Sequence, residues 1–451
     1  MNLHKLEALL GANQVVANEN NSKYSLQQGY FQPTREPLPI AYVKSIEELA
    51  EVLQLATIEK WAVIPVGGGT KLKIGNPPKR ADFFLSLAQM NQILEHEAAD
   101  LTTTVQAGCG FAHFQGSLGQ LGQYLPLNPP FAKSATVGGV LSTSSYGPMR
   151  LAGGLVRDWL IGIKVVTADG QVSKAGGKVV KNVAGYDLMK LYTGSFGTLC
   201  IIVEASFKLR PRPDQEALVL GVFTFSEINP AARKLLDSKL QPNALELLNF
   251  RAAQVCFPEL DIKQGQWVLA AQFTGSSQAI KHQIETTQEF WSTTKAENLV
   301  SVYSSDNQYL GWQKVVDFAE NYPSLGQFHA SSLPSKSITL VSEIEKALSA
   351  VVSDFALLAH IGNGVVQGFI NRDELLLNLD NEKQLKILSM MKNLRGFCEK
   401  SGGCLVLEDD TFHNKLDSWG TPPASISLMK TIKQKLDPLE MLNPGRFVGG
   451  I

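Results

Sequence analysis

Two local patterns in this sequence could support chemistry, and the first is a run of glycines. Gly67-Gly68-Gly69-Thr70 directly follows an apolar stretch that ends in Pro65-Val66. Consecutive glycines allow positive φ angles and a close approach of the backbone to a ligand, and successive amides can point toward an anion such as pyrophosphate. A tight turn between a strand and a helix explains the same run equally well, so the glycines alone leave both interpretations open.

The second pattern is the segment HIGNGVVQ, which runs from His360 to Gln367. A histidine next to flexible glycines is typical of metal sites and acid/base sites, because imidazole binds metals and exchanges protons near neutral pH. Many such sites place a second histidine close by, where this chain has Gln367. The segment therefore indicates either a working active site or only the outline of one.

The segments around the glycine run must position it. WAVIPV at 61–66 predicts a buried strand, and residues 40–43 predict a short strand before it. Between them, Ser45 is a good helix N-cap, Glu48 completes a capping box, and apolar residues then recur at helical spacing. The glycines are not spaced as GxGxxG and no GKS or GKT follows, so this turn is neither a dinucleotide fingerprint nor a P-loop.

Later segments predict a second region of different character. Strands are expected at 102–107 and 160–168, with a long Gly-, Ser- and Pro-rich stretch between them at 126–154, and such stretches are usually functional. The punctuation LRPRPD at 209–214 indicates a domain boundary. Beyond it, LVLGVFTF, WVLAAQFTG and SITLVS predict strands, whereas AARKLLDSKL, SQAIKHQIETTQEFW and residues 424–436 predict helices, which is an α+β pattern.

Composition limits the class of protein. The chain has 451 residues, 44% of them hydrophobic and 18% charged, with a net charge of −1, which suits two or three folded domains. No block of like charge indicates nucleic acid or an anionic membrane as a partner. No apolar run is long enough to span a bilayer, and the first residues lack the pattern of a signal peptide. We therefore expect a cytoplasmic protein, with any membrane association arising through partner subunits.

The cysteines exclude some redox cofactors. There are five, at widely spaced positions, and no CxxC, CxxCxxC or CxxCH run, so an iron–sulfur cluster or a c-type haem has no place in this chain. Free thiols in a reducing compartment are the simplest interpretation.

Three segments in order resemble the FAD-binding domain of the vanillyl-alcohol oxidase/p-cresol methylhydroxylase flavoproteins, the PCMH type. They start at Pro65, Ala135 and Lys181, and they resemble the family patterns PxGGGT, AT(I/V)GG and KNxxGYDLxxLxxGSxGTLGII. Cys200 stands where the third pattern usually has glycine, and we expect this departure to have little effect. Relatives that attach FAD covalently use a histidine or cysteine in the glycine loop, where this chain has Thr70 and Lys71, so the resemblance implies non-covalent FAD.

The resemblance also implies which residues contact FAD. Val66 to Thr70 would wrap the pyrophosphate, and the later segments would line the flavin and its ribityl and phosphate arm. The implied cofactor-binding residues are Pro65, Val66, Gly67, Gly68, Gly69, Thr70, Pro129, Ala135, Thr136, Gly138, Gly139, Ser142, Arg157, Asp158, Gly197 and Ile202.

The C-terminal segment narrows the resemblance. The ending LNPGRFVGG, with GGLVRD at 153–158, is similar to the FAD-binding E subunits of glycolate oxidase, also called glycolate dehydrogenase. In that family a D subunit carries FAD and the 2-hydroxy acid site, and an F subunit carries iron–sulfur clusters. The resemblance implies a complex with D- and F-type partners that oxidises glycolate to glyoxylate.

The wider family places its substrate site on the motifs HxGDGNxH and GGxxxxEHGIGxxK, which supply metal ligands and a base. By this resemblance His360 and Glu408 keep their positions, whereas Gln367 and Asp409 stand where the family has histidines. Catalytic zinc-like sites usually have three protein ligands, so no metal site is expected here. The catalytic residues stay open, with His360, Glu408 and Asp409 as candidates, and a degenerate pocket with local bonds of His360 as the alternative.

The remaining histidines carry weaker expectations. His4, His96, His282 and His329 are expected to be surface or satisfied polar residues, while His113 and His413 are minor candidates for a site role.

The sequence thus predicts an α+β chain with three parts. They are a two-subdomain PCMH-type FAD-binding domain at 1–213, an α+β cap domain with an antiparallel sheet at 214–436, and a tail at 437–451 that returns to the FAD domain. The predicted function is an accessory FAD-binding subunit of a glycolate dehydrogenase complex. A self-sufficient D-2-hydroxy acid dehydrogenase and a non-catalytic scaffold stay as alternatives.

Overall fold

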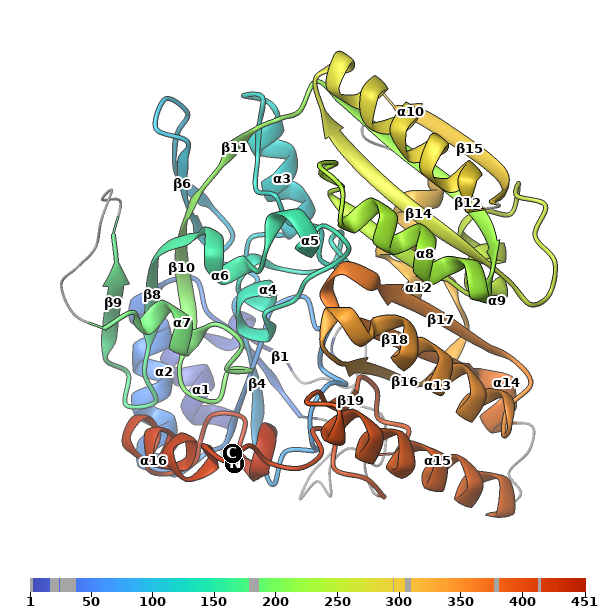
Figure 1. Cartoon of the computed structure of the whole chain (residues 1–451). Coiled ribbons are helices and arrows are strands. Elements are labelled where there is room, and N and C mark those ends of the chain that lie inside the picture. The colour runs from blue at the N-terminus through green and yellow to red at the C-terminus, as the bar shows by residue number, and fades with distance from the viewer. Residues whose placement is uncertain are drawn as a thin grey trace. The chain divides into compact units, whose positions relative to one another are not determined.

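A computed structural model of the chain describes residues 3–16, 24, 38–177, 186–294, 296–304, 310–376, 381–412 and 415–451 (Figure 1). The chain folds as two compact units. Unit 1 comprises Met1–Tyr146, Leu155–Arg212 and Thr421–Ile451, and unit 2 comprises Gly147–Gly154 and Pro213–Gly420.

Unit 1 begins with a four-stranded sheet in the order β1-β2-β4-β3. Its strands are β1 (Val15–Val16), β2 (Ile40–Tyr42), β4 (Phe83–Ser86) and β3 (Val63–Val66), and β4 runs parallel to both β2 and β3. Helices α1 (Leu3–Leu10) and α2 (Ile46–Glu59) belong to the same part. Ser45 caps α2 by accepting from the Glu48 amide, but the Glu48 carboxylate accepts from Lys44, one residue before the position that a capping box uses.

The second sheet of unit 1 has five antiparallel strands in the order β5-β6-β10-β8-β9. They are β5 (Ile93–Glu97), β6 (Thr102–Gln106), β10 (Ile201–Lys208), β8 (Leu160–Val166) and β9 (Val172–Gly176). Four short helices accompany this sheet: α3 (Phe111–Gly119), α4 (Val137–Thr143), α6 (Val156–Trp159) and α7 (Leu188–Tyr192). Strands β7 (Gln123–Tyr124) and β11 (Arg210–Pro211) form a small separate pair.

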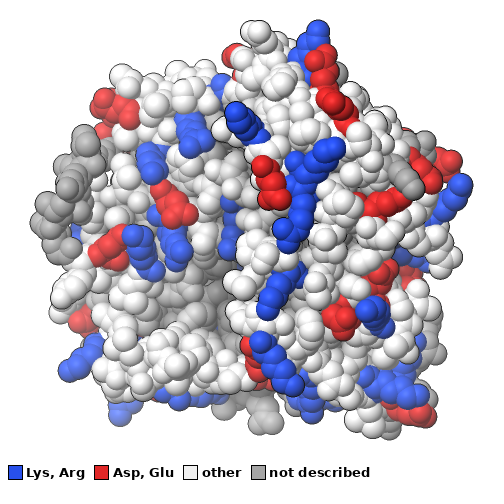
Figure 2. All heavy atoms as spheres, viewed as in Figure 1, with Lys and Arg blue, Asp and Glu red and all other residues white. Residues whose placement is uncertain are grey.

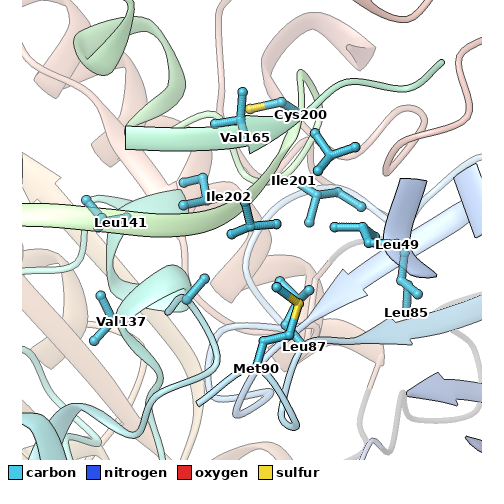
Figure 3. Close-up of a cluster of buried hydrophobic side chains, with 14 of the residues drawn as sticks. Leu49, Leu85, Leu87, Met90, Val137, Leu141, Val165, Cys200, Ile201 and Ile202 are labelled. Atoms are coloured by element: carbon cyan, nitrogen blue, oxygen red, sulfur yellow. The ribbon is translucent and has the colours of Figure 1, made fainter. Parts of the chain in front are cut away.

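One hydrophobic core joins the two sheets of unit 1. Figure 3 shows Leu49 of α2 and Leu85 of β4 in the same cluster as Val137 of α4 and Ile202 of β10. Both sheets bury side chains in this core. The end of β3, which the glycine run follows, is therefore held close to the start of β10.

The C-terminal segment completes unit 1. Helix α16 (Ile426–Leu436) buries Lys433, whose ammonium donates to the carbonyl oxygens of Thr198 at 2.7 Å and Leu442 at 2.9 Å, and to the Asp437 carboxylate at 2.6 Å. Burial lowers the pKa of Lys433, and Asp437 opposes this effect. The boundary of unit 1 therefore falls before α16, at Thr421, whereas the sequence analysis assigned this helix to the cap domain.

Unit 2 is built on one eight-stranded antiparallel sheet in the order β15-β12-β14-β13-β17-β18-β16-β19. The strands are β15 (Glu297–Ser304), β12 (Gln215–Thr224), β14 (Gln266–Gly275), β13 (Ala244–Leu248), β17 (Phe355–His360), β18 (Val365–Asn371), β16 (Ser324–Ser331) and β19 (Leu405–Leu407). The short helix α5 (Arg150–Gly153) also belongs to this unit, because Leu151 packs on Gly362.

Helices cover both faces of this sheet. One core contains apolar residues of α8 (Phe225–Leu236), α10 (Ser277–Thr293), α13 (Ser337–Ser349) and α15 (Asn381–Lys400), and the other contains those of α9 (Phe250–Cys256), α11 (Leu310–Val316) and α12 (Phe318–Asn321). A further helix, α14 (Arg372–Leu376), follows β18. The prediction of a strand at SITLVS is wrong: these residues begin α13, because Leu340, Val341 and Ile344 are buried at helical spacing.

The visible face of the molecule carries both signs of charge interspersed (Figure 2). Within the described ranges, every helix falls short of the length or apolarity that crossing a bilayer requires.

Candidate functional site

A cleft in unit 1 brings together segments that are far apart in the sequence. Its walls come from the glycine run after β3, from α4, from the start of β10, and from the C-terminal tail. The lining residues are Pro65, Val66, Gly67, Gly68, Gly69, Thr70, Lys71, Leu72, Leu87, Ala107, Thr136, Gly138, Gly139, Ser142, Thr143, Phe196, Gly197, Cys200, Ile201, Ile202, Asn443 and Arg446.

The glycine run passes so close to the segment before α4 that side chains are excluded. A Cβ atom on Gly68 would lie 1.8 Å from the carbonyl oxygen of Ser134, and one on Gly67 would lie 2.1 Å from Thr136 Oγ1. Both distances are far below van der Waals contact. The cleft is therefore a cradle that requires glycine at both positions, with bare backbone facing whatever lies in it.

The segment before α4 is held in place by its own cap. Thr136 Oγ1 accepts from the Gly139 amide at 3.2 Å, and the Thr136 backbone is extended with φ −107°. Gly138 lies against Ala107, where a Cβ would approach the Ala107 Cβ to 2.7 Å. These contacts bring α4 and the end of β6 together and leave room for a ligand above the glycines.

The C-terminal tail forms another wall. Asn443 donates from its backbone amide to Val63 O at 3.0 Å, and Met441 O accepts from the Val63 amide at 2.8 Å, so the tail pairs with β3. Arg446 is buried and donates to the carbonyl oxygens of Leu72 and Ile74. The tail was predicted to return to the FAD domain, but Asn443 and Arg446 were not predicted to line the cleft.

The cleft carries positive charge beside the bare backbone. Lys71 lines it, and its ammonium lies 5.3 Å from the centre of the Phe131 ring. The Arg446 guanidinium also lines the cleft while its N–H groups are bound to carbonyl oxygens. A glycine cradle next to two cations suits a pyrophosphate group, and the apolar side chains Leu87, Ile201 and Ile202 suit the flat rings of a dinucleotide.

Most, but not all, of the predicted cofactor residues line this cleft. Pro129 and Ala135 are buried outside its lining, although Ala135 follows the carbonyl that meets Gly68. Arg157 and Asp158 are exposed at α6, where the Asp158 carboxylate accepts from the Leu155 amide at 2.8 Å. The predicted motif at 181–185 lies outside the described residues.

In unit 2 the histidine of HIGNGVVQ is paired with an acid. His360 Nδ1 lies 2.7 Å from Glu246 Oε2, and the side chains are 2% and 1% exposed. Burial raises the pKa of Glu246, and the imidazole opposes this effect. The partner of His360 lies 114 residues away in the sequence, on the neighbouring strand β13.

A second histidine–carboxylate pair lies on the same face of the sheet. His329 Nδ1 is 3.1 Å from Glu408 Oε1, with side chains 24% and 18% exposed. His329 lies opposite Gln367 of β18, and His360 lies opposite Val365 of the same strand. Val365 and Gln367 are two residues apart, so their side chains lie on the same face of the sheet. Directly opposed residues share a face, so both pairs and Gln367 do too. His329 was expected to be a surface or satisfied polar residue, and strand pairing alone brings it to Glu408.

The Asp409 carboxylate is hydrogen-bonded to backbone amides. It accepts from the amides of Gln327 at 2.7 Å and Thr411 at 3.1 Å. Burial raises the pKa of Asp409, and these amides oppose the effect. Among the residues that the structure describes, no group of three or more His, Cys, Asp or Glu side chains is arranged to hold a metal ion. His413 lies outside the described residues.

Comparison with protein families gives two matches that together cover most of the chain. Residues 37–176 match the family described as "FAD binding domain". Residues 212–447 match the family described as "FAD linked oxidases, C-terminal domain".

Individual relatives agree with these matches. The chain is 27% identical over 435 residues to "Glycolate oxidase subunit GlcD" of Bacillus subtilis, covering 92% of this chain and 90% of the relative. It is 28% identical to "D-2-hydroxyglutarate dehydrogenase" of Stutzerimonas stutzeri, covering 93% and 92%. With "Glycolate oxidase subunit GlcE" of Escherichia coli it shares 31% identity over 197 residues, which is 44% of this chain and 55% of the relative.

A solved structure has the same fold. The crystal structure of p-cresol methylhydroxylase with substrate bound superposes with a TM-score of 0.74 at 16% identity, covering 98% of this chain and 95% of that chain. The predicted α+β PCMH-type fold is therefore confirmed.

Proposed function

Since this chain belongs to the FAD-linked oxidases and is an FAD-dependent oxidoreductase, we propose that it serves as the FAD-binding subunit of a 2-hydroxy acid dehydrogenase complex. The substrate class follows the printed names of its relatives, which include a glycolate oxidase subunit and a D-2-hydroxyglutarate dehydrogenase. Glycolate is the substrate we assign to the complex, with D-type flavoprotein and F-type iron–sulfur subunits as partners.

The glycine cradle of unit 1 supports the binding of FAD. Gly67 and Gly68 would present bare amides to the pyrophosphate, Lys71 would balance its charge, and Ile201 and Ile202 would contact apolar ring surface. When bound, FAD supplies an acceptor for hydride. Thr70 and Lys71 offer no histidine or cysteine for a covalent link, so we propose that acid precipitation releases all FAD into the supernatant.

The observation that carries the accessory role is the state of the candidate catalytic groups. His360 is buried against Glu246, and Asp409 is bound to two backbone amides. A general base must be within hydrogen-bond reach of the substrate proton, and neither group is exposed. We infer that this chain contributes FAD binding and assembly, while a partner supplies the base.

The test is anaerobic mixing of the purified chain with excess glycolate or D-lactate, followed by flavin absorbance. We expect bound flavin that stays oxidised. Dye-linked glycolate oxidation should appear only when the D- and F-type partners and this chain are combined, and omission of this chain should lower it. A chain that neither retains FAD on gentle purification nor takes it up on reconstitution would contradict the proposal.

A second candidate function rests on the His329–Glu408 pair. An imidazole that is partly exposed and held by a carboxylate can act as a general base, as in other histidine–carboxylate pairs. The chain alone would then be a D-2-hydroxy acid dehydrogenase. Bleaching of the flavin by D-lactate or glycolate in the isolated chain, together with its loss in His329→Gln, would favour this candidate over the accessory role.

A further inference from the structure

Asn443 is a buried amide in the wall of the cofactor cleft. The residue is 3% exposed, and its backbone has φ 44°, a left-handed conformation that asparagine tolerates better than most residues. Its backbone amide donates to the Val63 carbonyl oxygen of β3 at 3.0 Å, and its own carbonyl oxygen accepts from the Arg446 amide at 3.2 Å. The amide is therefore held in position before any ligand arrives.

One half of this amide is used by the protein. Asn443 Nδ2 donates to the Phe196 carbonyl oxygen at 2.7 Å. A carbonyl oxygen only accepts, so the nitrogen must face Phe196, which settles the orientation of the amide. The side-chain oxygen of Asn443 consequently points elsewhere.

The other half has no partner among the described residues. Asn443 Oδ1 is buried without a hydrogen bond. The nearby Arg446 guanidinium donates to the carbonyl oxygens of Lys71, Leu72 and Ile74 instead. Buried acceptors in native proteins nearly always have a donor. A buried acceptor without a donor destabilises the folded state, because its lost hydrogen bonds to water are not replaced. An unpaired acceptor in a ligand cleft indicates a donor that belongs to the ligand.

We propose that Asn443 Oδ1 accepts a hydrogen bond from an N–H or O–H group of the bound FAD. FAD has such donors in both halves: hydroxyls of ribose and the adenine amine in the adenosine half, and ribityl hydroxyls and the ring N3–H in the flavin half. Phe196 and Gly197 line the same cleft as Asn443, and the hydrogen bond from Asn443 Nδ2 to the Phe196 carbonyl oxygen holds the amide in place. The inference rests on FAD as the cofactor, not on the identity of the substrate or partners.

The experiment compares two glycine variants of the same tail. Asn443→Gly removes the acceptor and keeps a residue that accepts positive φ. Glu440→Gly is the matched control, because Glu440 also has positive φ (49°) but is exposed and does not line the cleft. Apoprotein of the wild type and of each variant is titrated with FAD, ADP and FMN by calorimetry.

We expect Asn443→Gly to weaken FAD binding about tenfold, in line with the loss of one hydrogen bond to a buried acceptor. The affinity for only one of the two fragments should fall as well. It is the affinity for ADP if the donor lies in the adenosine half of FAD, and the affinity for FMN if the donor lies in the flavin half. Glu440→Gly should leave all three affinities unchanged.

Two results would overturn the inference. Equal weakening of ADP and FMN would mean that Asn443 only holds the tail in place, and unchanged FAD affinity would mean that Oδ1 has no donor in the cofactor. A wild-type apoprotein that binds none of the three would overturn the assignment of FAD to this cleft and the inference with it.

Discussion

The two polar regions of this molecule differ in what they leave open. At the cleft of unit 1 the glycine run lies directly against the segment before α4, since Gly67 and Gly68 have no space for even a Cβ atom. The sheet face of unit 2 carries full-sized polar side chains, but these meet one another as His360–Glu246 and His329–Glu408. The first region presents glycine backbone to a cleft, and the second pairs imidazoles with carboxylates of the same chain.

Under the proposed accessory role, this difference separates FAD binding from catalysis within one chain. A residue can keep its position in a motif and still be paired with a neighbouring side chain, as His360 is with Glu246. Absent side chains are harder to reassign, because a clash with the backbone follows any replacement. Glycines therefore report a ligand site more securely than histidines do.

The largest effect is expected from Gly68→Ala, which changes the glycine run that lines the cleft of unit 1. The new Cβ would collide with the Ser134 carbonyl oxygen, so the two walls must separate and FAD retention should fall by at least about 100-fold, roughly 3 kcal/mol. The ratio of flavin to protein absorbance after gel filtration measures this. The control is Gly116→Ala on the exposed face of α3, where a Cβ meets nothing and retention should not change. A folded Gly68→Ala variant with full flavin content would contradict the cradle.

The next effect concerns the two histidine–carboxylate pairs of unit 2. His360→Leu leaves Glu246 buried without its imidazole, and breaking a buried pair in this way destabilises by about 3–5 kcal/mol. His329→Leu breaks the half-buried pair and should lose less than about 1 kcal/mol. Urea unfolding of unit 2 measures both, and flavin content should be unaffected in each. Equal losses in the two variants would show that burial does not distinguish the pairs.

The buried Lys433–Asp437 ion pair in unit 1 allows a test of whether the C-terminal tail supports the cleft. Lys433→Met removes the ammonium that joins Thr198, Asp437 and Leu442, although Asp437 keeps the amides of Met441 and Leu442 as donors. We expect a loss of about 3 kcal/mol, at the low end for buried pairs. Unlike His360→Leu, this variant should also speed the release of FAD, which stopped-flow fluorescence follows. Unchanged release would mean that the tail does not support the cleft.

The smallest effect is a pH dependence. Burial raises the pKa of Glu246 above its value of about 4.3 in the unfolded chain, so the folded state keeps the proton to higher pH. The contribution of Glu246 to stability is then greatest below about pH 4.3 and declines as pH rises through the folded pKa. Unfolding of wild type and Glu246→Gln across this range should show a difference that shrinks with pH. A constant difference would contradict the raised pKa.

Local patterns predicted much of unit 1 from the sequence alone. The strand before the glycine run, the cap at Ser45, and the glycines themselves depend on neighbours within a few residues, which a sequence displays. Asn443 and Arg446 were missed as cleft residues because they reach β3 and residues 71–74 across some 370 positions. His329 was missed for the same reason, since 79 residues separate it from Glu408. SITLVS was misassigned because six apolar and small residues suit a strand as well as a helix until burial decides.

The tail contacts also set an order of events during synthesis. Residues near the start of the glycine run are made early, yet the wall that Asn443 and Arg446 supply is made some 370 residues later. At about 5–20 residues per second, a ribosome needs at least roughly 20 seconds to close that interval. Until then β3 lacks the edge that Met441 and Asn443 provide, and the nascent chain has no complete place for a nucleotide. Cofactor loading in this protein is therefore expected only after Met441 to Arg446 have been made and have reached β3.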